Sequence, residues 1–130
     1  MLFRSDVEDI IGMLDVPFCV ASSGDHSKMQ ATLGATGLLP LFDGRIFSVV
    51  DVARAKPAPD IFLHAAEQMR ADPGRTTVIE DTVNGVRAAR AAEMTVYGYA
   101  GLTPAAKLTE AGAHKTFAHM RELEDLLGLS

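Results

Sequence analysis

Two adjacent acidic residues lie at the boundary between an apolar run and an alanine-rich stretch. Glu80 and Asp81 follow the apolar run TTVI (76–79) and precede the alanine-rich stretch TVNGVRAARAA (82–92). This pattern predicts a buried strand that ends at the acids and a helix that begins directly after them. The helix dipole accounts for one acid, whereas two adjacent acids repel each other unless a cation joins them. Carboxylate oxygens suit Mg²⁺, so a metal site and a helix cap are both open for this pair.

A lysine and two serines could serve the same chemistry. Two of the three residues that follow Lys56 are prolines, which hold the backbone extended. Lys56 is either an ordinary solvated lysine or a fixed positive charge for a phosphate group. Ser22 and Ser23 stand at the end of the apolar run VPFCVAS (16–22). They form either a polar turn that caps the next helix or an anion site made of a hydroxyl and backbone N–H groups.

Short runs rich in Val, Ile, Phe, Tyr and Thr recur along the chain, separated by amphipathic stretches. Runs of this kind are typical of strands that are buried on both faces. The predicted strands lie in residues 16–22, 45–50, 76–81, 95–100 and 115–119, and the predicted helices in residues 4–15, 25–34, 56–70, 82–92 and 103–113. The alternation of strand and helix predicts an α/β fold, a doubly wound parallel sheet with helices on both faces.

In such a sheet, ligands bind beyond the carboxyl ends of the strands. Ser22, Lys56 and the Glu80–Asp81 pair each follow a different predicted strand. We therefore expect a hydroxyl, a cation and two carboxylates to converge on one edge of the sheet. The convergence is informative because each of these residues alone has an ordinary structural explanation.

The composition narrows the class of protein. The 130 residues fit one domain, the net charge is −5, and Lys and Arg are not clustered, which argues against a nucleic-acid partner. No stretch reads as a membrane span or a signal peptide, so we expect a cytoplasmic protein without a membrane partner. The single cysteine, Cys19, lies in an apolar run and is predicted to be a buried, inert thiol. The four histidines show no metal-ligand spacing.

Three segments, in this order and at these spacings, resemble one known family. CVASSG (19–24), RAKPAPDIF (54–62) and VIEDTVNGVRAARAAEM (78–94) resemble the haloacid dehalogenase-like (HAD) hydrolase superfamily. The subgroup is that of beta-phosphoglucomutase and the sugar-phosphate and phosphoglycolate phosphatases. The resemblance implies a HAD-like, magnesium-dependent phosphatase or phosphomutase. Its substrate would be a small phosphorylated metabolite, such as a sugar phosphate, and the reaction would pass through an aspartyl-phosphate.

The resemblance also implies a role for each candidate residue. Ser22 would bind the phosphoryl group through its hydroxyl, with the backbone of Ser23 close by. Lys56 would be the catalytic cation, which neutralises the phosphoryl group and the nucleophilic carboxylate. Glu80 and Asp81 would hold Mg²⁺, directly or through water. These roles agree with what phosphoryl transfer needs, namely positioning and charge stabilisation.

The family's first motif, a strand that ends in Asp-x-Asp-Gly-Thr and carries the nucleophile, has no counterpart in this sequence. The acids of RSDVEDIIGMLD (4–15) lie on a helical pattern instead. The chain resembles a C-terminal portion, a single partial core domain over 1–130 without the central first strand and the helical cap. In the family the absent strand lies between the strand that ends at Ser22 and the strand that ends at Asp81. We therefore expect it to be inactive alone. The alternative is a non-catalytic phosphate-binding, metal-binding or assembly module, and unpaired strand edges would favour a homo-oligomer.

Two further positions depart from the family pattern. Ala55 stands where the family usually has Gly before the lysine, and Glu93 stands where it has Gly between helix and strand. If position 93 needs a left-handed backbone, Glu costs on the order of 1 kcal/mol relative to Gly. We expect the fold to tolerate that cost.

Overall fold

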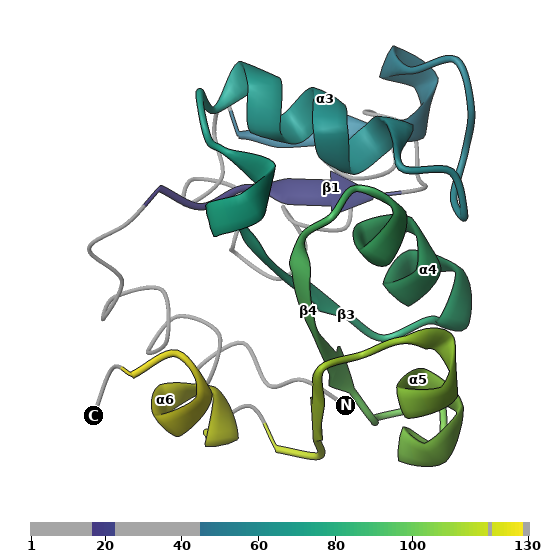
Figure 1. The fold of residues 1–130 in the computed structure, drawn as a ribbon, viewed down its shortest axis with the longest axis vertical. Coiled ribbons are helices and arrows are strands. Elements are labelled where there is room, and N and C mark those ends of the chain that lie inside the picture. The colour runs from purple at the N-terminus through teal and green to yellow at the C-terminus, as the bar shows by residue number, and fades with distance from the viewer. Residues whose placement is uncertain (1–16, 23–44, 120, 129–130) are drawn as a thin grey trace, which may run out of the picture.

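Strands and helices alternate along the part of the chain that the structure describes. The structure is a computed structural model and describes residues 17–22, 45–119 and 121–128. The helices expected in residues 4–15 and 25–34 lie outside this part. The strands are β1 (Val20–Ser22), β2 (Ile46–Ser48), β3 (Thr77–Glu80), β4 (Thr95–Tyr99) and β5 (Lys115–Phe117). The α-helices are α3 (Asp60–Gln68), α4 (Val83–Ala91), α5 (Ala105–Ala111) and α6 (Glu122–Leu126), and two 3-10 turns are η2 (Val49–Asp51) and η3 (Pro73–Arg75) (Figure 1).

This order confirms the predicted α/β class. Every predicted strand contains an observed one, and the predicted helices 56–70, 82–92 and 103–113 contain α3, α4 and α5. The observed elements are shorter than the predicted runs, and the sequence predicts no helix at α6. None of the described helices is long and apolar enough to cross a membrane. Cys19 is half-buried, and burial raises the pKa of its thiol, as expected for an unreactive cysteine.

All pairings between the described strands are parallel, as predicted, but these strands form two sheets. β1 pairs with β2, while β3, β4 and β5 form a second sheet in that order. Within the described part of the chain, β1 and β3 are not paired with each other. The division therefore falls where the resemblance places the absent central strand, between the strand that ends at Ser22 and the strand that precedes Asp81.

Helices cover both faces of the three-stranded sheet. Alternate side chains of β4 point to opposite faces and pack against the helices on each side. Val96 packs in the main core, and Leu108 of α5 lies directly over Gly98. Tyr99 packs on the other side with β5 and with Leu123 of α6. Figure 1 shows α4 and α5 on one side of β4 and α6 on the other.

The main core is built from small residues on α4 and larger ones around it. Ala88 and Ala89 are fully buried, which lets α4 approach the sheet closely. Val86, Ile61 and Leu108 are also fully buried in the same cluster. Full burial of a side chain of this size stabilises the fold by roughly 1.5–3 kcal/mol. The core therefore fixes the start of α4, where the acidic pair stands.

Both long helices end with a residue other than glycine in the left-handed region. Arg70 follows α3 with φ 55°, and Glu93 follows α4 with φ 62°. After α4, the N–H of Glu93 donates to the carbonyl oxygen of Arg90, and the N–H of Met94 donates to the carbonyl oxygen of Ala89. These two bonds make a Schellman motif, which usually has glycine at the left-handed position. Position 93 is therefore left-handed, and the cost expected for Glu at this position applies.

Candidate active site

Glu80 is a buried acid at the end of β3. Val78 and Glu80 are 8% and 9% exposed, whereas Ile79 between them is 39% exposed. Glu80 therefore points to the covered side of the strand, where its side chain lies against Gly85 in the first turn of α4. A carboxylate in such surroundings is strongly destabilising unless it is paired with a cation and hydrogen-bonded.

Lys56 is the cation that pairs with Glu80. Its Nζ lies 2.6 Å from Oε2 of Glu80, and the two side chains are 11% and 9% exposed. The same ammonium group lies 5.0 Å from the ring centroid of the buried Phe62 in α3. The pair joins two segments that are 24 residues apart in the sequence. It brings the loop after β2 to the carboxyl end of β3.

The loop that carries Lys56 is held at both ends. Ser48, fully buried at the end of β2, donates its backbone N–H to Asp51 at 2.9 Å. Arg54, on the exposed side of the loop, pairs with Asp60 at the start of α3 at 2.8 Å. The contact of the buried Ser48 defines the path of the loop after β2, whereas the exposed Arg54–Asp60 pair contributes little. Lys56 therefore approaches the sheet edge from a defined position.

The second oxygen of Glu80 accepts hydrogen bonds from the residues that follow it. Oε1 lies 3.0 Å from the N–H of Asp81 and 3.4 Å from the hydroxyl of Thr82. The Thr82 hydroxyl oxygen in turn accepts the N–H of Gly85 at 3.0 Å, which makes Thr82 the N-cap of α4. The sequence offers a helix cap as one explanation of the two acids, but the residue that caps α4 is Thr82. Both oxygens of Glu80 have protein partners.

Asp81 is the exposed member of the acidic pair. Desolvation of its carboxyl group and the negative charge of Glu80 raise the pKa of Asp81. A cation beside Asp81 would relieve both effects, and carboxylate oxygens are ligands of Mg²⁺. Among the described residues, no three His, Cys, Asp or Glu side chains lie close enough to hold a metal ion. Asp81 therefore fits as one open ligand of a metal site that needs further donors.

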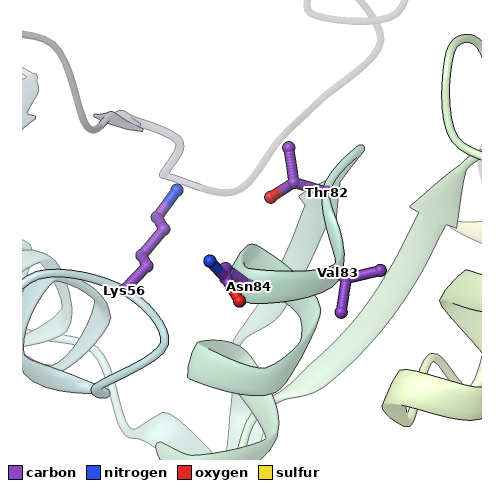
Figure 2. Close-up of a pocket in the computed structure, with 4 residues that line it drawn as sticks. All are labelled: Lys56, Thr82, Val83 and Asn84. Carbon is purple, nitrogen blue, oxygen red and sulfur yellow. The ribbon is translucent and has the colours of Figure 1, made fainter.

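A hollow of about 370 Å³ opens beside Lys56. The described residues that line it are Lys56, Thr82, Val83 and Asn84. Figure 2 shows Lys56 on one side of the space and Thr82 and Asn84 on the other, with polar atoms turned toward the space. Ligand pockets in proteins commonly have volumes of this order. An ammonium group, a hydroxyl and an amide thus face a space that fits a small polar molecule.

The structure brings some of the predicted site residues together and leaves the roles of the others untested. Lys56 and Glu80 are in direct contact, and Asp81 follows Glu80 at the start of α4. Ser22 ends β1 in register with Ser48, the last residue of β2, so the two strands end level with each other. Ser23 lies outside the described residues. The roles predicted for the two serines stay predictions.

Three residues of the site are absent from the sequence-based set. Thr82 carries a recognisable signal, because threonine before a helical pattern is a preferred N-cap. Gly85 carries a second signal, because glycine inside an alanine-rich helix lowers helix stability and needs a reason. Asn84 has no signal of its own in the sequence, and its place beside Lys56 is seen only in the structure.

Known proteins match both the sequence and the fold. The haloacid dehalogenase-like hydrolase family matches residues 4–93. The 6-phosphogluconate phosphatase of Escherichia coli K12 is 32% identical over 131 residues, which cover 96% of this chain and 59% of that protein. A haloacid dehalogenase-like protein of Agrobacterium tumefaciens superposes with a TM-score of 0.89 at 36% identity, over 94% of this chain and 58% of that one.

A hydrolase from Deinococcus radiodurans, solved with bound phosphate and sodium, superposes with a TM-score of 0.86 at 30% identity. The match covers 97% of this chain and 58% of that one. The chain therefore spans somewhat under 60% of the length of all three proteins. These matches confirm the resemblance that the three sequence segments indicate, including its restriction to part of the longer proteins.

Proposed function

Because the chain belongs to the haloacid dehalogenase-like hydrolase family, we propose that it supplies the phosphate-binding and metal-binding part of a phosphatase or phosphomutase. The proposed substrate is a small phosphomonoester such as a sugar phosphate. The similarity to a 6-phosphogluconate phosphatase supports this substrate class. The observation that carries the proposal is the 2.6 Å pair of Lys56 and Glu80 beside the hollow.

In this proposal the Lys56 ammonium binds the oxygens of the phosphoryl group. Its ion pair with Glu80 and the hydrogen bonds of its loop hold the ammonium group in place before the ligand arrives. A side chain that is already ordered loses little entropy on binding. A charge in partly buried surroundings also acts more strongly on a phosphate than the same charge in water.

Asp81 is the oxygen ligand that we propose for Mg²⁺, with Glu80 adding negative charge beside it. Mg²⁺, when bound, would neutralise charge on the phosphoryl oxygens. The Ser22 hydroxyl and the Ser23 N–H would bind the same oxygens from the end of β1. The raised pKa of Asp81 supports this assignment, because the carboxylate charge is incompletely compensated in the chain itself.

The proposed reaction needs a nucleophile that the sequence does not contain. An Asp carboxylate would attack phosphorus, the substrate oxygen would leave with a proton, and water would then hydrolyse the aspartyl-phosphate. No Asp-x-Asp-Gly-Thr segment occurs in the 130 residues. We therefore propose that this chain binds Mg²⁺ and phosphate but does not complete a turnover.

A chimera tests the proposal directly. The chain is joined to the part of the E. coli relative that lies outside the matched region, where the family's first motif is expected. We expect the chimera to hydrolyse para-nitrophenyl phosphate and a sugar phosphate only with Mg²⁺. Lys56→Met and Asp81→Asn should each lower kcat/KM by on the order of 10²-fold, the loss typical of removing one charge-stabilising group.

The matched control is Arg54→Met, which removes a cation from the same loop but from its exposed side. We expect the control chimera to stay within about twofold of the unsubstituted one, because exposed ion pairs contribute little. The chain without the added segment should show no hydrolysis. Magnesium-dependent hydrolysis by the chain alone, or a chimera indifferent to Lys56→Met, would contradict the proposal.

The division of the sheet favours a second candidate, assembly through strand edges. Among the described strands, β1 pairs only with β2 and β3 pairs only with β4. A strand edge without a partner is a site for pairing with another chain. We propose that the isolated chain forms a homo-oligomer through these edges. Sedimentation at two protein concentrations tests this, and a monomer at both concentrations would contradict it.

A further inference from the structure

Gly85 stands in the first turn of α4, directly beneath the carboxyl group of Glu80. Its φ is not in the left-handed region, so the backbone at this position does not require glycine. Glycine inside a helix lowers helix stability relative to alanine. The reason for glycine at this position must therefore be space rather than backbone conformation.

The space above Gly85 is filled by Glu80. A Cβ atom added to Gly85 would overlap Cγ, Cδ and Oε2 of Glu80, because each of them lies closer to it than the sum of the two van der Waals radii. These three atoms are also the nearest ones to such a Cβ atom. Even an alanine methyl group would therefore force the Glu80 side chain out of its observed position. The effect on the helix itself would be small, because the backbone of α4 needs no change.

The position of the Glu80 carboxyl group determines three contacts at once. Its Oε2 holds the Lys56 ammonium at 2.6 Å, and its Oε1 accepts the N–H of Asp81 and the hydroxyl of Thr82. Gly85 also donates its own N–H to the Thr82 oxygen at 3.0 Å. A displaced carboxyl group would leave Lys56 without its ion-pair partner and would free the turn that carries Asp81.

We propose that Gly85 is a positioning residue for the Lys56–Glu80 pair. The absence of a side chain at position 85 creates the slot in which the Glu80 carboxyl group lies between Lys56 and the start of α4. The geometric part of this inference concerns the chain alone. Its importance for phosphate binding rests on the proposed function.

Gly85→Ala tests the inference, with Gly74→Ala as the matched control. Among the described residues other than its chain neighbours, a Cβ atom at Gly74 would meet Asp72 Oδ1 at 3.4 Å, an ordinary contact, and no other atom within 4 Å. The first measurement is the ¹H–¹⁵N NMR signal of the Lys56 ammonium group, assigned by its loss in Lys56→Met. We expect this signal to be protected from exchange in the unsubstituted chain and in Gly74→Ala, and to be lost in Gly85→Ala.

The second measurement is a double-mutant cycle in urea with Glu80→Ala. We expect Gly85→Ala to raise the unfolding equilibrium constant by on the order of tenfold in the unsubstituted chain, as overpacking does. In the Glu80→Ala background the slot is empty, so the same substitution should have no effect or should lower that constant. An equal effect in both backgrounds, or a Lys56 signal that survives Gly85→Ala, overturns the inference.

A Gly85→Ala chain that does not fold is also informative. Folding of the Glu80→Ala/Gly85→Ala chain would then support the inference, because removal of the Glu80 side chain relieves the overlap. Failure of this double variant, in conditions where Glu80→Ala alone folds, overturns it. None of these measurements contains Mg²⁺ or phosphate. A chain that binds neither would therefore refute the proposed function and leave the role of Gly85 unaffected.

Discussion

Replacing Lys56 by Met removes the cation of the buried pair but keeps an unbranched side chain of similar reach over Phe62. Glu80 is then left as a buried side chain, 9% exposed, without a cation beside it but still with the hydrogen bonds from the Asp81 N–H and the Thr82 hydroxyl. Removal of one partner from a buried ion pair typically destabilises a protein by about 3–5 kcal/mol. The two remaining hydrogen bonds reduce this loss, so we expect about 3 kcal/mol for Lys56→Met, at the lower end of that range.

This free energy converts into a shift of the melting temperature. The unfolding entropy is about 2.1 cal/mol/K per residue, which gives about 0.27 kcal/mol/K for a chain of 130 residues. A loss of about 3 kcal/mol therefore lowers Tm by roughly 11 °C. Circular dichroism at about pH 7 measures this shift directly. Arg54→Met removes an exposed cation and should leave Tm almost unchanged, because exposed ion pairs contribute little to stability.

The double variant Lys56→Met/Glu80→Gln distinguishes an unpaired charge from a simple loss of packing. Glutamine keeps an oxygen for the Asp81 N–H but carries no charge, so the desolvation penalty disappears. We expect the double variant to be more stable than Lys56→Met alone, within about 1 kcal/mol of the unsubstituted chain. A Lys56→Met chain that melts within about 3 °C of the unsubstituted one would refute this reasoning. A Tm of the double variant below that of Lys56→Met alone would also refute it.

Three other substitutions probe the site and its support. The pKa of Asp81 is raised in the folded chain, so ionisation of its carboxyl group destabilises the fold as pH rises through that pKa. Asp81→Asn should therefore raise Tm at about pH 7 and leave Tm unchanged below pH 3.8, the ordinary pKa of this group, and thermal melts at both pH values test this. Glu93→Gly relieves a left-handed residue with φ 62° and should raise the free energy of unfolding by about 0.5–1 kcal/mol in urea titrations, whereas no gain would argue against strain at this turn. Leu108→Ala empties a fully buried position over Gly98 and should lower the same free energy by about 2–5 kcal/mol, so a loss under about 1 kcal/mol would contradict the packing of α5.

The elements that position the site could be predicted from local sequence patterns. The run 76–81 has the composition of a buried strand, and the stripe of Val86 and Ala89 on α4 has helical spacing. Both signals are local, so they can be recognised without knowledge of the tertiary structure. The parallel order then brings Lys56 and Glu80 to one edge, because parallel strands all end on the same side.

The contacts within the site could not be predicted in the same way. That Glu80 pairs with Lys56 while Asp81 stays exposed depends on which face of β3 is covered, a property of the assembled sheet. The slot over Gly85 depends on a side chain five positions earlier in a different element. The helix α6 has only five residues, too few for a periodic signal, and it packs through Leu123 against the far side of the sheet.

Charge balance at the strand ends would couple the binding of the proposed Mg²⁺ ion to that of the proposed phosphate. Lys56, Glu80 and Asp81 together carry one positive and two negative charges, a net charge of −1. A phosphate dianion that enters this site meets net repulsion, whereas Mg²⁺ changes the sum to +1 and makes the same approach favourable. Binding of the two ions should therefore be mutually dependent, and thermodynamic linkage requires the same factor in both directions.

We expect inorganic phosphate to bind on the order of tenfold more tightly at saturating Mg²⁺, a coupling of about 1.4 kcal/mol, and Mg²⁺ to bind more tightly by the same factor at saturating phosphate. Isothermal titration of the chain in both orders measures the two factors. In Asp81→Asn the site without metal is neutral, so phosphate should bind without Mg²⁺ at least as well as in the unsubstituted chain, and the coupling should vanish. Equal phosphate affinity with and without Mg²⁺ in the unsubstituted chain would mean that Asp81 holds no metal near the phosphate, because a divalent cation between them cannot leave the affinity unchanged.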